Sequence, residues 1–169
     1  PLEGVLMFPD TYLPLNIFET RYLEMVNKAI SSKSRLVGMI QPNNSNQNKL
    51  YNVGCAGKII KFEETEDKRY LITLKGLCRF ELISEKTNRK NFKEAQIKWD
   101  RFSQDFEKLN INEKFTSLKS SLKKYFKIKK IRVNFEVIDK CNDYNFVDQI
   151  TMICPLAFRL SNVINFELE

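Results

Sequence analysis

The sequence contains no histidine and only four cysteines, and this scarcity argues against metal and nucleophilic chemistry. Without histidine, a zinc site would need all four thiolates, normally as two close pairs, but Cys55, Cys78, Cys141 and Cys154 are widely spaced. A disulfide scaffold is not favoured either, because 169 residues can bury a core without cross-links. The usual general base of Ser–His and Cys–His pairs is missing. We therefore expect reduced thiols, no metal, no cofactor and no catalytic residue.

Long apolar runs are also absent. No segment approaches the ~18 consecutive apolar residues that span a bilayer. The opening PLEGVLMFPD lacks the basic region that precedes the apolar stretch of a secretory signal. Hydrophobic residues nevertheless make up 43% of the chain and aromatic residues 12%, which is enough for one domain or two small lobes. We expect a soluble, cytoplasmic protein that does not associate with a membrane.

The positive charge is concentrated in one segment. The formal net charge is +7, and residues 114–132 contain many lysines but no acidic residue. Within this basic segment, Lys119, Lys123 and Lys127 project beside one apolar stripe of a predicted helix. Three interpretations stay open: a solvated helix face, a site for an acidic protein, or a site for nucleic acid. The few aromatic residues here do not indicate a base-stacking platform.

Patterns before residue 100 predict strands and one helix. Pro9 and Pro14 interrupt the apolar residues of 5–17, which is typical of a bent or interrupted strand. Apolar residues then recur at helical spacing over 20–31. Gly76 interrupts the row of large apolar side chains in its strand and predicts a bulge or a barrel corner. Further strands are predicted by apolar and alternating patterns at 35–41, 53–62, 69–83 and 92–99.

The periodicity becomes helical after Asp100. An apolar stripe from Phe115 to Phe126 predicts one helix, and similar patterns predict two more at 144–154 and 156–166. The segment PNNSNQNK, between the strands predicted at 35–41 and 53–62, predicts a solvated loop. The predicted fold class is therefore α+β, with a β-rich lobe over residues 1–100 and an α-helical lobe over residues 101–169.

Three separated blocks carry a distinctive pattern: PLEGVLMFPDTYLPLNIFETRYLEMVNKAI, VGCAGKIIKFEE and YLITLKGLCRFEL. In order and spacing they resemble the Lon amino-terminal domain family, whose pattern runs roughly PL-x-x-V-L-x-FP-x-x-x-LPL-x-IFE-x-RY-x-x-M, then VG-x-x-G-x-I and GxxRF. The resemblance covers about residues 1–99, and the helical part is similar in character only. Asn16 stands where the family often has histidine, and Thr20 stands where proline commonly opens the helix. Both replacements are compatible with the fold.

The resemblance implies a small antiparallel pseudo-barrel with one helix, of the kind likened to the PUA fold, and then a helical lobe of the same domain. It also implies a substrate-recognition module without enzymatic activity, because ATP hydrolysis and peptide cleavage in Lon belong to later domains. The implied partners are unfolded or client polypeptides and an ATP-dependent protease. Since the chain begins inside the first block, we expect further residues upstream.

Motifs for catalysis are not evident in the sequence. No G-x-x-x-x-G-K-[ST] phosphate loop is present. Ser120 and Ser121 each begin an S-x-x-K pattern, but the companion motifs S-D-N and K-T-G are missing. These observations agree with a binding module.

The first block supplies the candidate polypeptide-binding residues. Phe8, Leu13, Leu15, Phe18 and Tyr22 are candidates for an apolar surface near the junction of the two lobes, with core packing as the alternative for each. Such a surface would capture exposed apolar segments of unfolded polypeptides.

Three charged residues are embedded in apolar sequence: Glu19, Arg21 and Arg79. The hypothesis is a partly buried contact of Glu19 with Arg79 or Arg21 that fixes the helix against the sheet, and the alternative is a ligand site. A PUA-like barrel beside a basic helix also leaves RNA binding through residues 114–132 as an alternative function. A purely structural or oligomerising module is a third possibility.

Overall fold

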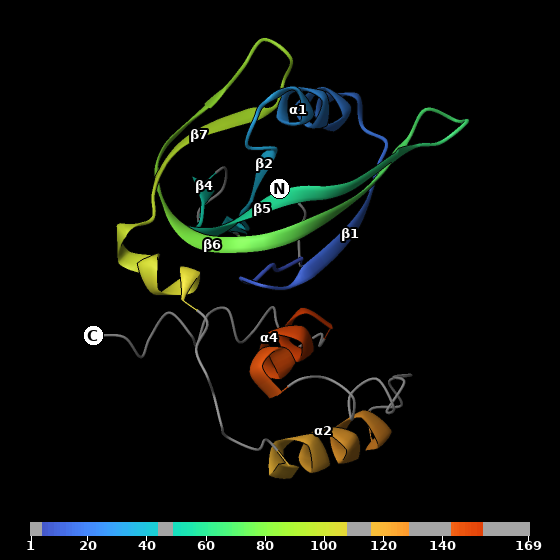
Figure 1. Ribbon diagram of the computed structural model, residues 1–169, viewed down its shortest axis with the longest axis vertical. Coiled ribbons are helices and arrows are strands. Elements are labelled where there is room, and N and C mark those ends of the chain that lie inside the picture. The colour runs from blue at the N-terminus through green and yellow to red at the C-terminus, as the bar shows by residue number, and fades with distance from the viewer. Residues whose placement is uncertain (1–4, 44–48, 108–115, 129–142, 154–169) are drawn as a thin grey trace.

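The computed structural model describes residues 5–43, 49–107, 116–128 and 143–153 (Figure 1). An antiparallel sheet with strand order β1-β6-β5-β2 dominates the first part of the chain. The strands are β1 (Tyr12–Ile17), β2 (Leu36–Met39), β5 (Val53–Glu64), β6 (Tyr70–Thr87) and β7 (Lys93–Lys98). The predicted antiparallel α+β fold is confirmed.

Strand β6 is the centre of the sheet, because it pairs with β5, β1 and β7. β1 pairs with its first third, from Lys75 back to Tyr70, and β7 pairs with its last third, from Glu81 to Thr87. The register passes from Gly57–Gly76 to Ala56–Cys78 and so leaves Leu77 as an extra residue. The bulge predicted at Gly76 is therefore confirmed next to it.

One helix, α1 (Thr20–Ser31), packs against this sheet, with the bounds that the sequence predicts. Its first turn lacks a side-chain cap, and the carbonyl of Glu19 instead accepts the N–H groups of Tyr22 and Leu23. Val26 and Ala29 are buried in the main core with apolar residues of four strands. Ion pairs of Lys28 with Glu94 and of Lys90 with Glu24 join the outer side of α1 to β7 and the loop before it.

A tight turn before β1 locks the amino-terminal segment onto β6. The hydroxyl of Thr11 donates to the carbonyl of Phe8 at 2.7 Å, and Asp10 takes a positive φ of 56°. Asp10 N–H donates to the Gly76 carbonyl, and Gly76 N–H donates to the Thr11 carbonyl. A Cβ on Gly76 would lie 1.9 Å from the Phe8 carbonyl oxygen, so only glycine fits this crossing.

The two later sequence blocks interlock in the same way. The Phe80 ring lies over Gly54 of the neighbouring strand, where a Cβ would come within 2.5 Å of it. At Gly57, a Cβ would lie 2.7 Å from the Met7 methyl group. The glycines of VG-x-x-G-x-I therefore make room for an aromatic ring of GxxRF and for a methionine of the first block.

The prediction of a solvated loop at PNNSNQNK is incomplete. The segment predicted as a solvated loop contains a small hairpin, in which β3 (Pro42–Asn43) pairs with β4 (Lys49–Leu50). The pattern misses these strands because each has only two residues.

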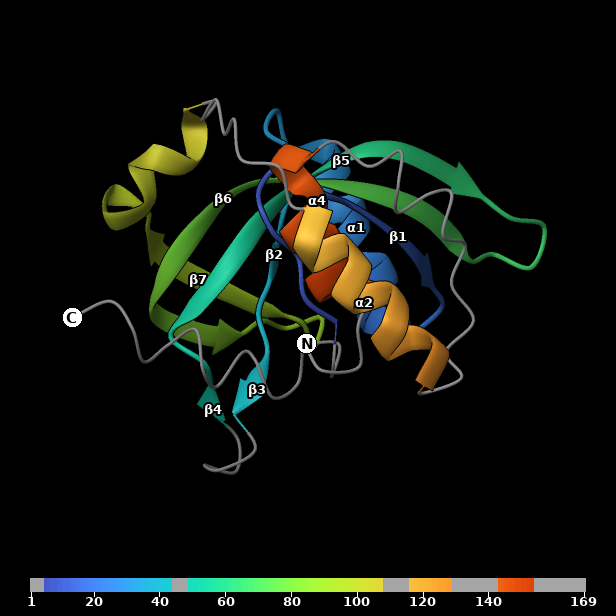
Figure 2. The same cartoon turned by 90° about the horizontal axis from the view of Figure 1, so that it is seen from below.

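Described residues after Lys98 are helical, as predicted. The 3₁₀ segment η1 (Asp100–Phe106) follows β7, and α2 (Thr116–Ile128) and α4 (Asp143–Ile153) come later. Figures 1 and 2 both place α4 between α2 and the barrel, and Met152 of α4 packs against the main core. The helix predicted at 156–166 lies outside the described residues, and the division into two lobes stays a prediction. Within the described ranges, none of the helices has the length and apolarity needed to cross a membrane.

Candidate functional site

The candidates of the first block do not form one exposed surface. Leu13 is buried in the core, and Leu15 and Tyr22 pack against it. Phe8 is half-buried, and its backbone closes the turn that docks on Gly76. Only Phe18, with 65% of its surface exposed, is largely open to solvent. The prediction that the five residues form one apolar surface is corrected, because the inward row of β1 is needed to fill the barrel.

The far end of the β5–β6 hairpin projects beyond the rest of the sheet (Figure 1), and it has exposed apolar side chains on both of its faces. Phe18 lies here at the end of β1, with its ring 5.9 Å from the Arg69 guanidinium. The Phe62 ring meets the Tyr70 ring edge-on at 4.9 Å. We call residues 60–71 of this hairpin the arm, and the exposed residues Phe18, Ile60, Phe62 and Leu71 the arm surface. Phe62 pairs with Ile72 and Leu71 pairs with Glu63, so these two side chains lie on opposite faces of the arm.

Sequence reasoning missed three members of the arm surface. Leu71 belongs to the outward row of β6, so the alternation that identifies this strand contained a signal for it. Ile60 is an extra residue in the register between Ile59 and Lys61, and nothing in the sequence marks this second bulge. Phe62 comes after that bulge, so its exposure could not be read from a simple period of two.

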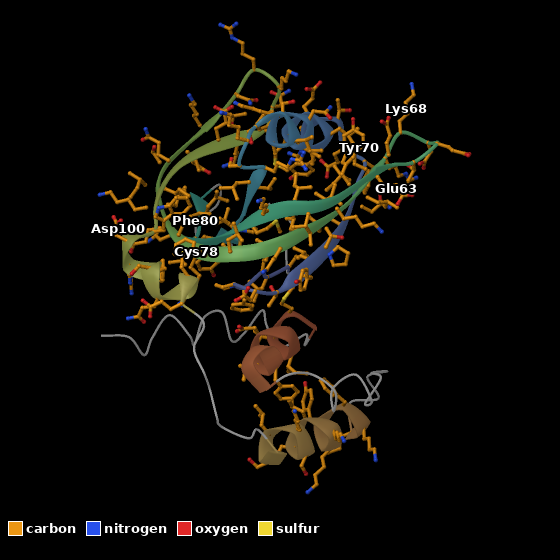
Figure 3. All side chains as sticks on the ribbon, in the orientation of Figure 1. Glu63, Lys68, Tyr70, Cys78, Phe80 and Asp100 are labelled. Carbon is orange, nitrogen blue, oxygen red and sulfur yellow. The ribbon has the colours of Figure 1, made fainter. Side chains whose placement is uncertain are left out.

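The tip of the arm is an ordered acidic turn. Thr65 N–H donates to the Arg69 carbonyl and Lys68 N–H to the Thr65 carbonyl, both at 2.9 Å. The Thr65 hydroxyl bonds to Asp67 and lowers the pKa of that carboxyl, with a smaller contribution from Arg69. Glu63, Lys68 and Tyr70 are labelled on this arm in Figure 3, and Glu63, Glu64 and Glu66 are all exposed. The arm thus presents apolar side chains and charged side chains of both signs on a defined backbone, with Arg69 paired to Asp67.

A second exposed apolar group lies where β7 passes into η1. The rings of Trp99 and Phe106 meet edge-on at 6.5 Å, and 62% of the surface of Phe106 is exposed. Ile83 is exposed at a bulge in the β6–β7 pairing, and Arg101 pairs with Glu81 at 3.2 Å. We call Ile83, Trp99 and Phe106 the junction group.

Of the two arginines predicted as partners of Glu19, Arg21 contacts it and Arg79 contacts a different carboxylate. Glu19 pairs with Arg21 at 2.7 Å, but both side chains are more than 40% exposed, so this pair is a surface contact. Arg79 instead contacts Asp105 of η1 through Nη2 at 2.7 Å and Nε at 3.0 Å. The expected contact that fixes α1 by way of Arg79 is therefore wrong. Sequence distance hid the real partner, because Asp105 lies in a segment without a clear period.

The Arg79–Asp105 contact ties η1 to the sheet. Asp105 also accepts the backbone N–H of Arg79 at 2.8 Å, and the guanidinium lies 4.7 Å from the centre of the Phe102 ring. Burial opposes ionisation of Asp105, but the hydrogen bonds from Arg79 outweigh it and lower the pKa of this carboxyl. The Cys78 thiol donates to the Phe102 carbonyl at 3.3 Å.

A second carboxylate reaches the same place from α4. Burial raises the pKa of Asp148 to about 6; the charge of Arg79 partly offsets this, and the charge of Asp105 adds to it. Two carboxylates from η1 and α4 therefore share the field of one guanidinium from β6. This arrangement connects three elements of the protein, β6, η1 and α4.

The basic segment also has a structural role. Lys119 of α2 lies with its ammonium 4.9 Å from the centre of the Phe146 ring of α4, and that ring is fully buried. Lys123 is half-buried and Lys127 is exposed. The three lysines therefore do not form a uniform solvated face.

The described thiols are poor nucleophiles. Cys55 and Cys78 are free and buried, and burial raises the pKa of Cys55 to about 12 and also raises the pKa of Cys78. Cys141 and Cys154 lie outside the described residues. In the part of the chain that the structure describes, no three acidic or cysteine side chains cluster in a way that could hold a metal ion.

Comparisons with known proteins agree with this architecture. A sequence model of the family described as "ATP-dependent protease La (LON) substrate-binding domain" matches residues 1–160. A curated relative, Lon protease 2 of Sorangium cellulosum (strain So ce56), is 27% identical over 89 residues, which is 50% of this chain and 11% of that protein.

Two solved structures share the fold. The Lon N-terminal domain protein from Xanthomonas campestris aligns with a TM-score of 0.54 and 17% identity over 98% of this chain and 95% of that one. The N-terminal domain of Mycobacterium avium complex Lon protease aligns with a TM-score of 0.56 and 10% identity over 88% of this chain and 77% of that one.

Proposed function

Because this chain belongs to the family of LON substrate-binding domains, we propose that it captures exposed apolar segments of unfolded or client polypeptides without catalysing a reaction. Its partners would be those polypeptides and an ATP-dependent protease that acts on them. With Cys55 and Cys78 free and buried, the protein would work in the cytoplasm.

The arm surface is the observation that carries this proposal. Its four large apolar side chains are each 38–65% exposed, although burying such a side chain is worth about 1.5–3 kcal/mol. Several exposed apolar side chains on one projecting hairpin favour a role in binding. An unfolded segment could recover part of that free energy by covering the arm, whereas a folded protein has few apolar segments to offer.

The test is binding of labelled casein, a permanently unfolded protein, by fluorescence anisotropy. We expect weak binding that the double variant Phe18→Ser/Phe62→Ser reduces at least tenfold, which corresponds to about 1.4 kcal/mol. The matched control is Ile83→Ser/Phe106→Ser, which removes two equally exposed side chains from the junction group. A loss confined to the control variant would move the site to the junction, and no binding by the wild-type chain would refute the proposal.

Salt dependence separates this function from RNA binding. Apolar capture changes little with salt, whereas phosphate contacts of Lys119, Lys123 and Lys127 would give a slope near −2 in log K against log salt. We expect casein binding with a slope much shallower than −2. RNA binding at physiological salt that disappears in the triple alanine variant, without affinity for casein, would favour the alternative.

A further inference from the structure

The arm has one backbone edge that is not used in the sheet. β2 pairs with β5 only from Cys55 to Lys58, and one further bond joins Ile59 N–H to the Arg35 carbonyl at 3.0 Å. From Ile60 to Glu64, the backbone of β5 pairs with β6 alone among the residues described. The side chains over this stretch are all exposed. An antiparallel strand with one partner leaves N–H and C=O groups on its other side.

The other edges are less suited to a partner strand. β1 contains Pro14, which has no N–H to donate. β2 has only four residues. β7 begins and ends with lysine, and Glu94 in it is engaged by Lys28 of α1. After Leu82, β6 pairs with β7 alone among the described residues, but Ile83 is the one exposed large apolar side chain on that stretch, whereas the β5 edge has both Ile60 and Phe62.

Side chains beside this edge indicate which strand would fit. Phe62 lies on the edge itself, and Ile60 lies at the bulge where pairing with β2 has ended. Lys61 is the exposed basic residue of Ile60–Glu64, and it is outnumbered by Glu63, Glu64 and, in the turn, Glu66. The exposed carboxylates of these three glutamates complement basic side chains.

We infer that the arm holds its polypeptide by strand addition along Ile60–Glu64, and that it prefers extended segments in which apolar residues alternate with lysine or arginine. This inference rests on the proposed function and specifies its mode. Because main-chain hydrogen bonds do not depend on side chains, the arm would bind polypeptides of many sequences. The arm surface and the three glutamates would set its preference for apolar and basic residues in the bound segment.

The test uses a labelled twelve-residue peptide that alternates valine or phenylalanine with lysine and threonine. A second peptide has the same side chains but N-methyl groups on its six central residues. N-methylation removes backbone donors while adding apolar surface, so it weakens strand pairing without weakening apolar capture. We expect the methylated peptide to bind at least tenfold more weakly.

The charge preference is tested with a third peptide, in which glutamate replaces lysine, and with the variant Glu63→Gln/Glu64→Gln/Glu66→Gln. We expect the glutamate peptide to bind about tenfold more weakly than the lysine peptide, and the triple variant to reduce this ratio to below threefold. Thermal unfolding of the variant checks that the arm stays folded.

Each outcome has a separate meaning. Equal binding of the methylated and unmethylated peptides would overturn strand addition but leave apolar capture standing. A charge ratio that the triple variant does not change would overturn the role of the glutamates. Failure of every peptide and of casein to bind would overturn both this inference and the proposed function.

Discussion

The absence of a side chain at Gly76 allows the amino-terminal turn to dock on β6. An added Cβ would lie 1.9 Å from the Phe8 carbonyl oxygen, which belongs to backbone and cannot rotate away. We expect Gly76→Ala to lower the free energy of unfolding by about 2–4 kcal/mol, measured by urea denaturation.

Gly38→Ala is the matched control for this substitution. Its Cβ would lie 3.3 Å from the end of the Phe80 ring, which can shift by a few tenths of an ångström. We expect a change below about 1 kcal/mol. Equal effects of the two substitutions would show that the crossing at Gly76 tolerates a side chain.

Asp148 makes stability depend on pH in an unusual direction. Its pKa in the folded protein, about 6, is above the unfolded value near 3.9, so the folded state holds this proton more tightly. The contribution of this carboxyl to stability is therefore largest below about pH 4 and is lost as pH rises through 6. We expect Asp148→Asn to stabilise the protein at pH 7 by about 1–2 kcal/mol, after allowance for partial exposure.

The measurement is the difference in urea stability between wild type and Asp148→Asn from pH 4 to pH 7. This difference should be near zero at pH 4 and should grow with pH. Asp105→Asn provides the opposite sign, because the pKa of Asp105 is lowered and its stabilisation is present at neutral pH. A flat difference for Asp148→Asn would mean that its carboxylate is well solvated.

The side chain of Phe146 anchors helix α4, whereas the side chain of the next residue, Val147, does not. Phe146 is fully buried beneath α2, whereas 43% of the surface of the next residue, Val147, is exposed. We expect Phe146→Ala to cost about 3 kcal/mol of unfolding free energy and Val147→Ala less than about 1 kcal/mol, by urea denaturation. Similar losses for the two variants would contradict this orientation of α4.

The sequence predicts an element well when its apolar residues follow a single periodicity over the whole element. Helix α1 has an apolar stripe over its whole length and was predicted at Thr20–Ser31, where it lies. The apolar pattern that predicts the helix at 144–154 includes both Phe146 and Val147, but adjacent helical residues diverge by about 100°, and packing of α4 against α2 decides which one is buried.

At the scale of the whole molecule, the sequence predicted the fold better than the site. The three blocks that resemble the Lon family supply the turn, the glycines and the ring that lock β1, β5 and β6 together, so they are chiefly a folding signature. The arm surface depends on a bulge at Ile60 and on where pairing with β2 ends, and neither has a local sequence signal. Exposure is a property of the assembled sheet, which a pattern along one strand does not contain.

The pairing of β1 with β6 has a consequence for synthesis on the ribosome. β1 leaves the ribosome early, but Tyr70–Lys75, the residues that complete its hydrogen bonds, are made only after α1, β2 and β5. During that interval β1 is an unpaired strand in a nascent chain, where such strands associate with one another. Pro14 in the middle of β1 removes one donor and weakens any such pairing. A proline within this strand therefore disfavours pairing of β1 with other chains until β6 has been made.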